Sequence, residues 1–175
     1  MTMQNVAGNI ISTSISLSNS EVNAITTYTI LFTISNRLIV GSFINVVLPS
    51  QLNIQNASAS CSMTGHTCSI ISTSNITVNI VSTIVPNTAL TITITNIKNA
   101  NEALTTNSFA IYTYYDSQYD SLVDLANTGI TVNMTPKLLS SGSVIPANMT
   151  NYAITNYEIN LTLLDPIPIG GYIRI

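Results

Sequence analysis

The two cysteines and the single histidine are the residues whose types and spacing could do chemistry. Cys61 and Cys68 enclose a six-residue segment that contains Gly65 and His66. Two cysteines across a glycine-containing turn can close a hairpin disulfide, and an even number of cysteines without a redox motif is typical of an oxidising compartment. Free thiols are one alternative. A zinc site is another, but a closed site needs a fourth ligand and the chain has no further Cys or His. We therefore predict a Cys61–Cys68 disulfide.

Three of the seven carboxylates are spaced four residues apart, at Asp116, Asp120 and Asp124. Calcium at a junction between repeats could use an oxygen cluster of this kind. A calcium loop of the EF-hand type, however, needs closer, alternating ligands and a glycine. We interpret the stretch as a solvated loop after a strand, and we predict no metal and no cofactor.

Several tyrosines lie beside these carboxylates. They are Tyr112, Tyr114, Tyr115 and Tyr119. A tyrosine combines an apolar ring with a polar hydroxyl, so a group of them can form a patch on which sugars stack. The ordinary alternative is that some of these rings pack in the core while the others lie at an interface.

The remaining ionisable residues are too few for most functions. The chain has 4 Lys and Arg against 7 Asp and Glu, and charged residues make up only 6% of its 175 residues. Four cations cannot form a phosphate-binding stripe, which argues against nucleic-acid binding. No Gly-x-Ser-x-Gly elbow or phosphate loop is present, and His66 lies between the cysteines. We expect a protein that is not an enzyme and has no catalytic residues.

The chain contains Asn-x-Ser/Thr sequons, which are acceptor sites for N-linked glycans, and we expect covalent glycans on this protein. They occur at Asn56, Asn75, Asn133, Asn148 and Asn160. The composition alone, 21 Asn and 45 Ser and Thr in 175 residues, predicts about five sequons, so their number is not evidence. The argument is the low charge, because charge usually keeps protein surfaces apart. Either glycans cover this surface or its sheet edges are consumed in assembly, and both interpretations favour an extracellular location.

Alternation of apolar and polar residues with period two recurs along the chain and predicts strands. Such stretches lie at 11–17, 28–34, 43–48, 76–80, 90–95, 109–113 and 130–132. Turn-like polar stretches separate them, and the longest apolar runs fall far short of a membrane span. We predict an all-β fold, an antiparallel immunoglobulin-like (Ig-like) sandwich of seven to nine short strands, without a helix and without a membrane span.

An internal repeat sets the expected domain organisation. Shifting the chain by 129 residues lays 24–46 on 153–175 without a gap, with 8 identities in 23 positions. The predicted core face, Tyr28, Ile30, Phe32 and Ile34, then falls on Tyr157, Ile159, Leu161 and Leu163. We expect residues 7–135 to be one complete repeat and 136–175 to be the opening strands of a second, incomplete one. Residues 1–6 would be a linker strand or the end of a preceding repeat.

The segments that carry this repeat also resemble a known group of proteins. Tyr28–Thr33, a turn, Gly41–Pro49 and the cysteine pair are similar to repeats of large cell-surface proteins of ciliates and other protists, and Asp165–Ile175 shows the same pattern. The resemblance implies a tandem array of Ig-like sandwiches at a cell surface or in a filament, and it carries no catalytic residues.

The function expected from these observations is that of a structural repeat unit in an extracellular, glycosylated surface protein or filament. Its partners would be neighbouring copies or repeats of the same protein, joined head to tail. Strands from elsewhere would cover the second unit, because forty residues with two or three strands cannot bury the face formed by Tyr157 to Leu163. The alternatives are an adhesion or carbohydrate-binding module at the tyrosines and an accessory domain of a secreted hydrolase.

Overall fold

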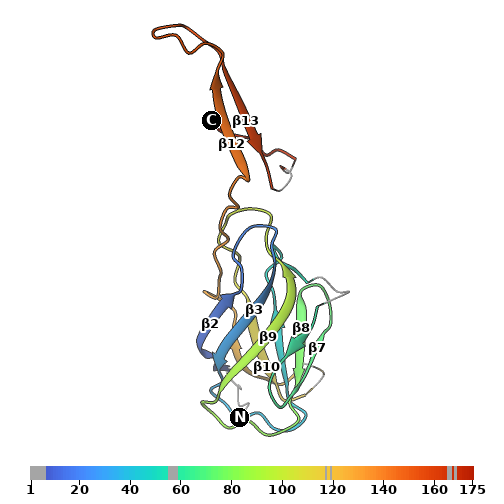
Figure 1. The fold of residues 1–175 in the computed structure, drawn as a ribbon. Coiled ribbons are helices and arrows are strands. Elements are labelled where there is room, and N and C mark those ends of the chain that lie inside the picture. Colours follow the sequence, from blue (N-terminus) through green and yellow to red (C-terminus); the bar gives the residue numbers. More distant parts are fainter. Residues whose placement is uncertain (1–6, 55–58, 117, 119, 165–166, 168) are drawn as a thin grey trace. The chain divides into compact units, whose positions relative to one another are not determined.

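The computed structural model describes residues 7–54, 59–116, 118, 120–164, 167 and 169–175 (Figure 1). These residues form thirteen strands and no helix. The chain divides into two compact units, residues 1–135 and residues 136–175. The first unit is a β-sandwich in which antiparallel pairs dominate, so the expected all-β fold class is confirmed, whereas the Ig-like assignment stays a prediction. The described part of the chain has no helix long and apolar enough to cross a membrane.

One layer of the sandwich is a six-stranded sheet, here called sheet A. Its order is β1 (Gly8–Asn9), β11 (Leu122–Ala126), β10 (Ala110–Tyr114), β4 (Phe43–Val47), β8 (Asn75–Asn79) and β7 (Thr67–Ile70). All neighbours are antiparallel except β1 and β11, which run parallel. The first strand of the unit, β1, therefore lies beside its last strand, β11. This pairing holds the two ends of the first unit together.

The other layer, sheet B, is built around two long strands. Its order is β2 (Ile11–Leu17), β3 (Ile25–Thr33), β9 (Ala89–Lys98) and β5 (Asn53–Ile54), and β6 (Cys61–Ser62) also pairs with β9. Along β3 the buried positions alternate with half-buried or exposed ones, as the period-two pattern predicts. Tyr28, Ile30 and Phe32 are fully buried and share one core with sheet A residues such as Ile44 and Ile111.

The first unit has more strands than predicted because three of its eleven strands are very short. Eight of the eleven strands in the first unit have four or more residues, which matches the predicted seven to nine. The other three, β1, β5 and β6, have two residues each and are too short to show a period. The strand predicted at 130–132 is wrong: Ile130 and Val132 are buried, but their carbonyls accept single hydrogen bonds from Phe109 and Thr106 instead of forming a ladder.

A buried polar pair ties the core to the loop that precedes β3. The hydroxyl of Tyr28 donates to Asn99 Oδ1 at 2.7 Å, and Asn99 Nδ2 donates to the carbonyls of Asn19 and Glu21 at 3.0 and 2.8 Å. Tyr28 is fully buried and Asn99 is 3% exposed. Burial also raises the pKa of the Tyr28 hydroxyl above its ordinary value. Each polar group therefore depends on the other for its hydrogen bond.

Tyr28→Phe is expected to lower the free energy of unfolding by about 1–3 kcal/mol, because Asn99 Oδ1 then loses its partner while it stays buried. Urea denaturation of both proteins measures this. Since the folded pKa is raised, the contribution of the Tyr28 hydroxyl is fully present below the unfolded value of about 10 and is lost as the pH rises above it. The difference between the two proteins should therefore shrink above about pH 10; a difference that grows there would contradict this account.

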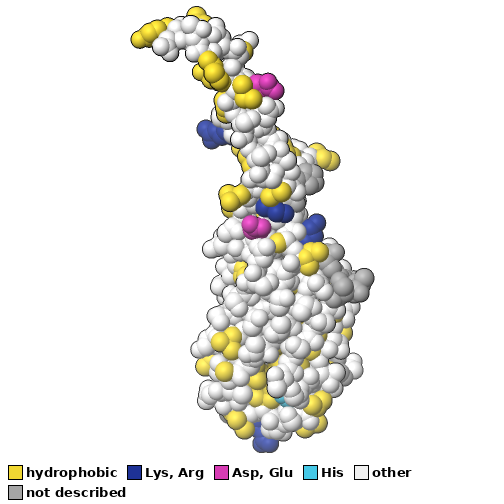
Figure 2. Space-filling view, in the orientation of Figure 1, with side chains coloured by type: hydrophobic (Ala, Val, Ile, Leu, Met, Phe, Trp, Pro, Cys, Tyr) yellow, Lys and Arg dark blue, Asp and Glu magenta, His cyan; other side chains and the backbone are white. Residues whose placement is uncertain are grey.

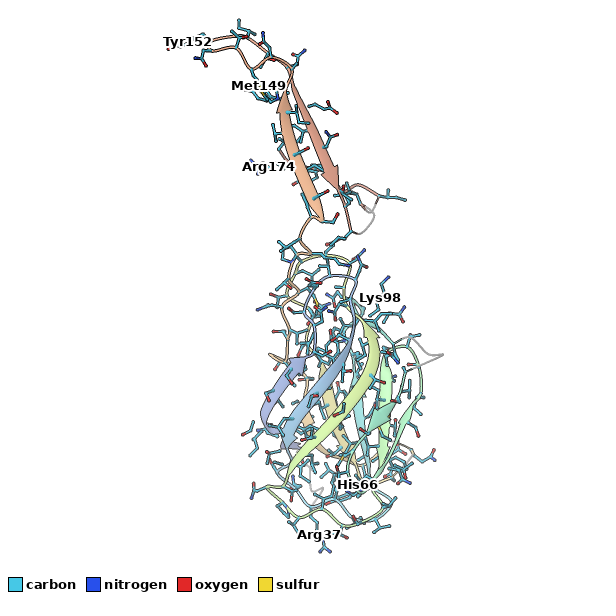
Figure 3. The ribbon with its side chains drawn as sticks, in the orientation of Figure 1. Arg37, His66, Lys98, Met149, Tyr152 and Arg174 are labelled. Atoms are coloured by element: carbon cyan, nitrogen blue, oxygen red, sulfur yellow. A yellow bond between two sulfur atoms is a disulfide. The ribbon has the colours of Figure 1, made fainter. Side chains whose placement is uncertain are left out.

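The second unit is a hairpin of two strands. β12 (Ser141–Pro146) pairs antiparallel with β13 (Tyr157–Thr162), and residues 147–156 connect them. Figure 3 labels Met149 and Tyr152 in this connection, and both side chains are exposed.

Candidate functional site

The disulfide bond joins the two layers of the sandwich. Cys61 lies on β6 in sheet B and Cys68 on β7 in sheet A, with their Cα atoms 5.7 Å apart. Between them the chain turns at Gly65, whose φ of +77° is a conformation that favours glycine, and the His66 amide donates to the Met63 carbonyl at 3.1 Å. The predicted pair is thus bonded, and it ties sheet A to sheet B.

His66 belongs to this turn and does not act as a metal ligand with the cysteines, which are bonded to each other. Its Nδ1 accepts a hydrogen bond from the Val81 amide at 3.3 Å. Partial burial lowers the pKa of the His66 ring below its ordinary value. Within the described ranges, no three His, Cys, Asp or Glu side chains are placed so that they could hold a metal ion.

The interpretation of the three aspartates as one solvated loop is wrong for Asp124. Asp116 and Asp120 do share a loop, where Asp116 Oδ1 accepts from the Asp120 amide at 3.3 Å. Asp124, in contrast, lies on β11 with no exposed surface. The Asn36 side-chain amide donates to its Oδ1 at 2.8 Å and the Asn36 backbone amide to its Oδ2 at 3.1 Å. Gly8 of β1 is the register partner of Asp124 and packs directly against it.

The tyrosines are divided between the sheet and the loop. Tyr112 and Tyr114 are both half-buried on β10, with ring centroids 6.3 Å apart, and Asn45 and Phe43 are their register partners on β4. Tyr115 is 46% exposed in the loop that follows. Tyr119 lies outside the described residues. Among the described residues, the structure therefore brings together Tyr112 and Tyr114 of the expected sugar-stacking patch.

The sequons differ in accessibility. Asn133, Asn148 and Asn160 are exposed, whereas Asn75 is only partly exposed on β8, and its Oδ1 is buried without a hydrogen-bond partner. Asn148 lies in the β12–β13 connection, where its Oδ1 accepts from the Thr150 amide at 2.9 Å. Asn56 lies outside the described residues.

The β12–β13 hairpin repeats the pairing of β2 and β3. In the first unit the register partners include Ser14↔Leu31, Ile15↔Ile30, Ser16↔Thr29 and Leu17↔Tyr28. Adding 129 to each number produces Ser143↔Asn160, Val144↔Ile159, Ile145↔Glu158 and Pro146↔Tyr157, and all four pairs are observed. A shift of one residue would turn every side chain to the other face, so agreement over four pairs also preserves the faces.

The connections between the paired strands repeat as well. The amides of Asn19 and Asn148 donate to the hydroxyls of Thr26 and Thr155, at 2.9 and 2.8 Å. The side chains of the same two asparagines accept from the amides of residues 21 and 150, at 2.8 and 2.9 Å. Asn23 and Tyr152 both have a positive φ, of 59° and 63°, which is uncommon for residues other than glycine. The two turns therefore share one backbone conformation at an offset of 129 residues.

The two hairpins differ in what covers them. Tyr28, Ile30 and Phe32 have no exposed surface, whereas Tyr157 is 63% and Ile159 is 37% exposed. Leu161 is partly exposed and Leu163 is 39% exposed. β3 has β2 on one side and β9 on the other, while β13 pairs only with β12 within the described part of the chain. The two hairpins thus have the same register, but only β3 is buried. The exposed apolar face and the open edge of β13 are therefore the candidate functional site.

Comparisons with known proteins leave the chain without an assigned family. No family model and no curated protein matches it. Among solved structures it is similar to BslA, a bacterial hydrophobin, with 12% sequence identity over 74% of this chain and 98% of that chain, at a TM-score of 0.46.

The arrangement at β13 is suited to holding another strand. An open edge offers backbone N–H and C=O groups in a row for hydrogen bonds to another strand. Burial of the exposed apolar face by that strand adds a favourable free energy. The site needs no titratable group and no metal, because main-chain hydrogen bonds and alternate apolar contacts are sufficient for strand addition.

Proposed function

We propose that this chain is a structural module of an extracellular array in which the sandwich of residues 7–135 is followed by the beginning of a second sandwich in residues 136–175. The observation that carries the proposal is the common register of β2–β3 and β12–β13 at an offset of 129 residues. A unit that begins a sandwich without completing it can bury its apolar face only against further strands, so residues 136–175 act by joining to the strands that complete them.

Two further observations support an extracellular place for the array. The bonded cysteines fit an oxidising compartment, because cytosolic thiols are kept reduced. The surface carries few charges: Figure 2 shows only a few Lys, Arg, Asp and Glu side chains on the face that it draws. With so little charge repulsion, a surface of this composition is suited to assembly and to a cover of glycans.

The proposal is tested by comparing residues 1–175 with residues 1–135 in solution. The buried apolar core lies between Ile10 and Met134, so the shorter chain contains a complete core of its own. We expect the longer chain to associate and to bind an apolar dye, and the shorter chain to be a monomer that binds little dye. Analytical ultracentrifugation measures the association. A longer chain that stays monomeric and binds no dye would contradict the proposal.

Glycan occupancy is expected to follow exposure in the folded chain. Asn148 is exposed in a turn and should be occupied, whereas Asn75 is expected to be bare because it is partly buried on β8, in the middle of three paired strands. Asn160 alternates with the apolar positions of β13, so a glycan there would leave the apolar face free for a neighbour. Glycopeptide mass spectrometry of natively purified protein checks this, and an intact mass equal to that of the bare chain would rule glycosylation out.

A further inference from the structure

The partner of the open β13 edge can be read from the first unit, because there the same hairpin is complete. β9 runs antiparallel to β3 on the side away from β2. The register partners are Tyr28↔Ile94, Thr29↔Thr93, Ile30↔Ile92, Leu31↔Thr91 and Phe32↔Leu90. This pairing shows which strand a hairpin of this geometry accepts, in which direction and in which register.

The side chains of β9 alternate in a way that suits this position. Leu90, Ile92 and Ile94 are buried, whereas Thr91 is exposed and Thr93 and Thr95 are half-buried on the opposite face. Each apolar residue lies opposite an apolar residue of β3, so the two strands form one continuous core face. β9 thus covers the edge of β3 that β2 leaves open and extends its apolar face.

We propose that the open edge of β13 binds, antiparallel, an extended strand of the β9 pattern that belongs to the module which the hairpin begins. The inference rests on the proposed function and deepens it, because it names the occupant and its register. Apolar residues of the incoming strand lie opposite Tyr157, Ile159 and Leu161, as Ile94, Ile92 and Leu90 lie opposite the corresponding residues of β3. Threonines or other polar residues alternate with them on the outer face.

One position of the hairpin adds a charge preference. Glu158 is the counterpart of Thr29, whose register partner on β9 is Thr93. The Glu158 carboxylate is exposed and accepts a hydrogen bond from Asn160 Nδ2 at 3.2 Å. A residue of the incoming strand at the Thr93 position therefore lies opposite a carboxylate. A lysine there should bind more tightly than threonine, because opposite charges directly across two strands attract.

The proposal is tested with a fluorescent peptide of residues 87–99 added to the full chain. We expect saturable binding, and slower hydrogen exchange of the amides of Tyr157 to Thr162. The peptide variant Thr93→Lys should bind about two- to fivefold more tightly at low salt. Ile92→Asp should lose binding at least about tenfold, since it places a charge in the apolar face.

Matched proteins locate the binding site. Residues 1–135, which hold a complete core, should not bind the peptide. The full-chain variant Ile159→Asp should lose binding, whereas Ile154→Asp, at a fully exposed position of the connection between β12 and β13, should keep it. Neither change touches the core of the first unit, so folding of the sandwich is unaffected.

Three results would overturn the inference. The first is no binding of the peptide, and the second is equal binding by residues 1–135. The third is a dimer in which β13 of one copy pairs with β13 of another and slows hydrogen exchange there, with no change when the peptide is added. If the peptide does not bind, but residues 1–175 associate and residues 1–135 do not, the proposed function stands. In that case only the strand proposed to occupy the β13 edge is wrong. If the two chains do not differ in association, the proposed function itself is contradicted.

Discussion

Gly8→Ala is expected to lower the free energy of unfolding of the first unit by about 2–4 kcal/mol, because the new methyl group would overlap with two side-chain atoms that are hydrogen-bonded to each other. A Cβ at residue 8 would fall on Asp124 Oδ1 and on Asn36 Nδ2. Asp124 Oδ1 cannot easily retreat, since Asp124 has no exposed surface, and Asn36 Nδ2 can move only by giving up its hydrogen bond to that carboxylate. The clash must therefore displace β1, the carboxylate or the Asn36 side chain.

The carboxylate makes this site costly to disturb. A buried charge is stable only while donors surround it, and here two N–H groups of one loop residue do so. If β1 moves away, water reaches Asp124 and the contact between the first and last strands of the unit is lost. The charge, the loop and the parallel strand pair therefore form one cooperative contact.

Urea denaturation of the two proteins measures the effect of Gly8→Ala. Gly142→Ala is the matched control, because a Cβ at Gly142 would meet Leu161 Cδ2 at 3.4 Å, an ordinary contact in the exposed hairpin. It should change the stability by less than about 0.5 kcal/mol. Asp124→Ala should destabilise the unit too, and the double variant should cost less than the sum of the single ones. A Gly8→Ala protein as stable as the control would contradict the described packing.

Loss of the disulfide is expected to cost about 2–3 kcal/mol and to lower the melting temperature by about 8 °C. The bond closes a short loop and so restricts the unfolded chain only moderately. Its position adds a local effect, because β6 and β7 belong to different sheets and β6 is only two residues long. Once the bond is broken, β6 should separate from β9 before the rest of the sandwich unfolds.

Thermal unfolding with and without reductant measures the global effect, and hydrogen exchange at residues 61–70 measures the local one. The double variant Cys61→Ser and Cys68→Ser is the control, since reductant should leave its melting temperature unchanged. Equal melting temperatures of the oxidised and reduced wild-type chain would show that the bond does not stabilise the fold. Increased exchange spread over both sheets would argue against a local role for β6.

Several features could be predicted because their signals are local. Period two in 28–34 and 90–95 is a property of neighbouring residues, and it predicted β3 and β9 with their buried faces. The cysteines lie close in the sequence, so the turn between them limits their separation. The predictions were wrong where burial does not produce a ladder, as at Ile130 and Val132. They were silent where a strand is two residues long, and they did not include β7 or β11.

The sequence by itself determined the all-β class, the cysteine pairing and the alignment of 24–46 with 153–175, because each depends on spacing along the chain. Only the tertiary structure decided what surrounds Asp124. Its partners Gly8 and Asn36 are far away in the sequence: Gly8 meets it because β1 pairs with β11, and Asn36 reaches it from the loop after β3. Only the tertiary structure likewise showed that β3 is paired on both edges while β13, among the described residues, is paired on one. Strand neighbours are set by backbone hydrogen bonds, which every residue can accept and every residue except proline can donate. The side-chain pattern of a strand therefore does not name its partner.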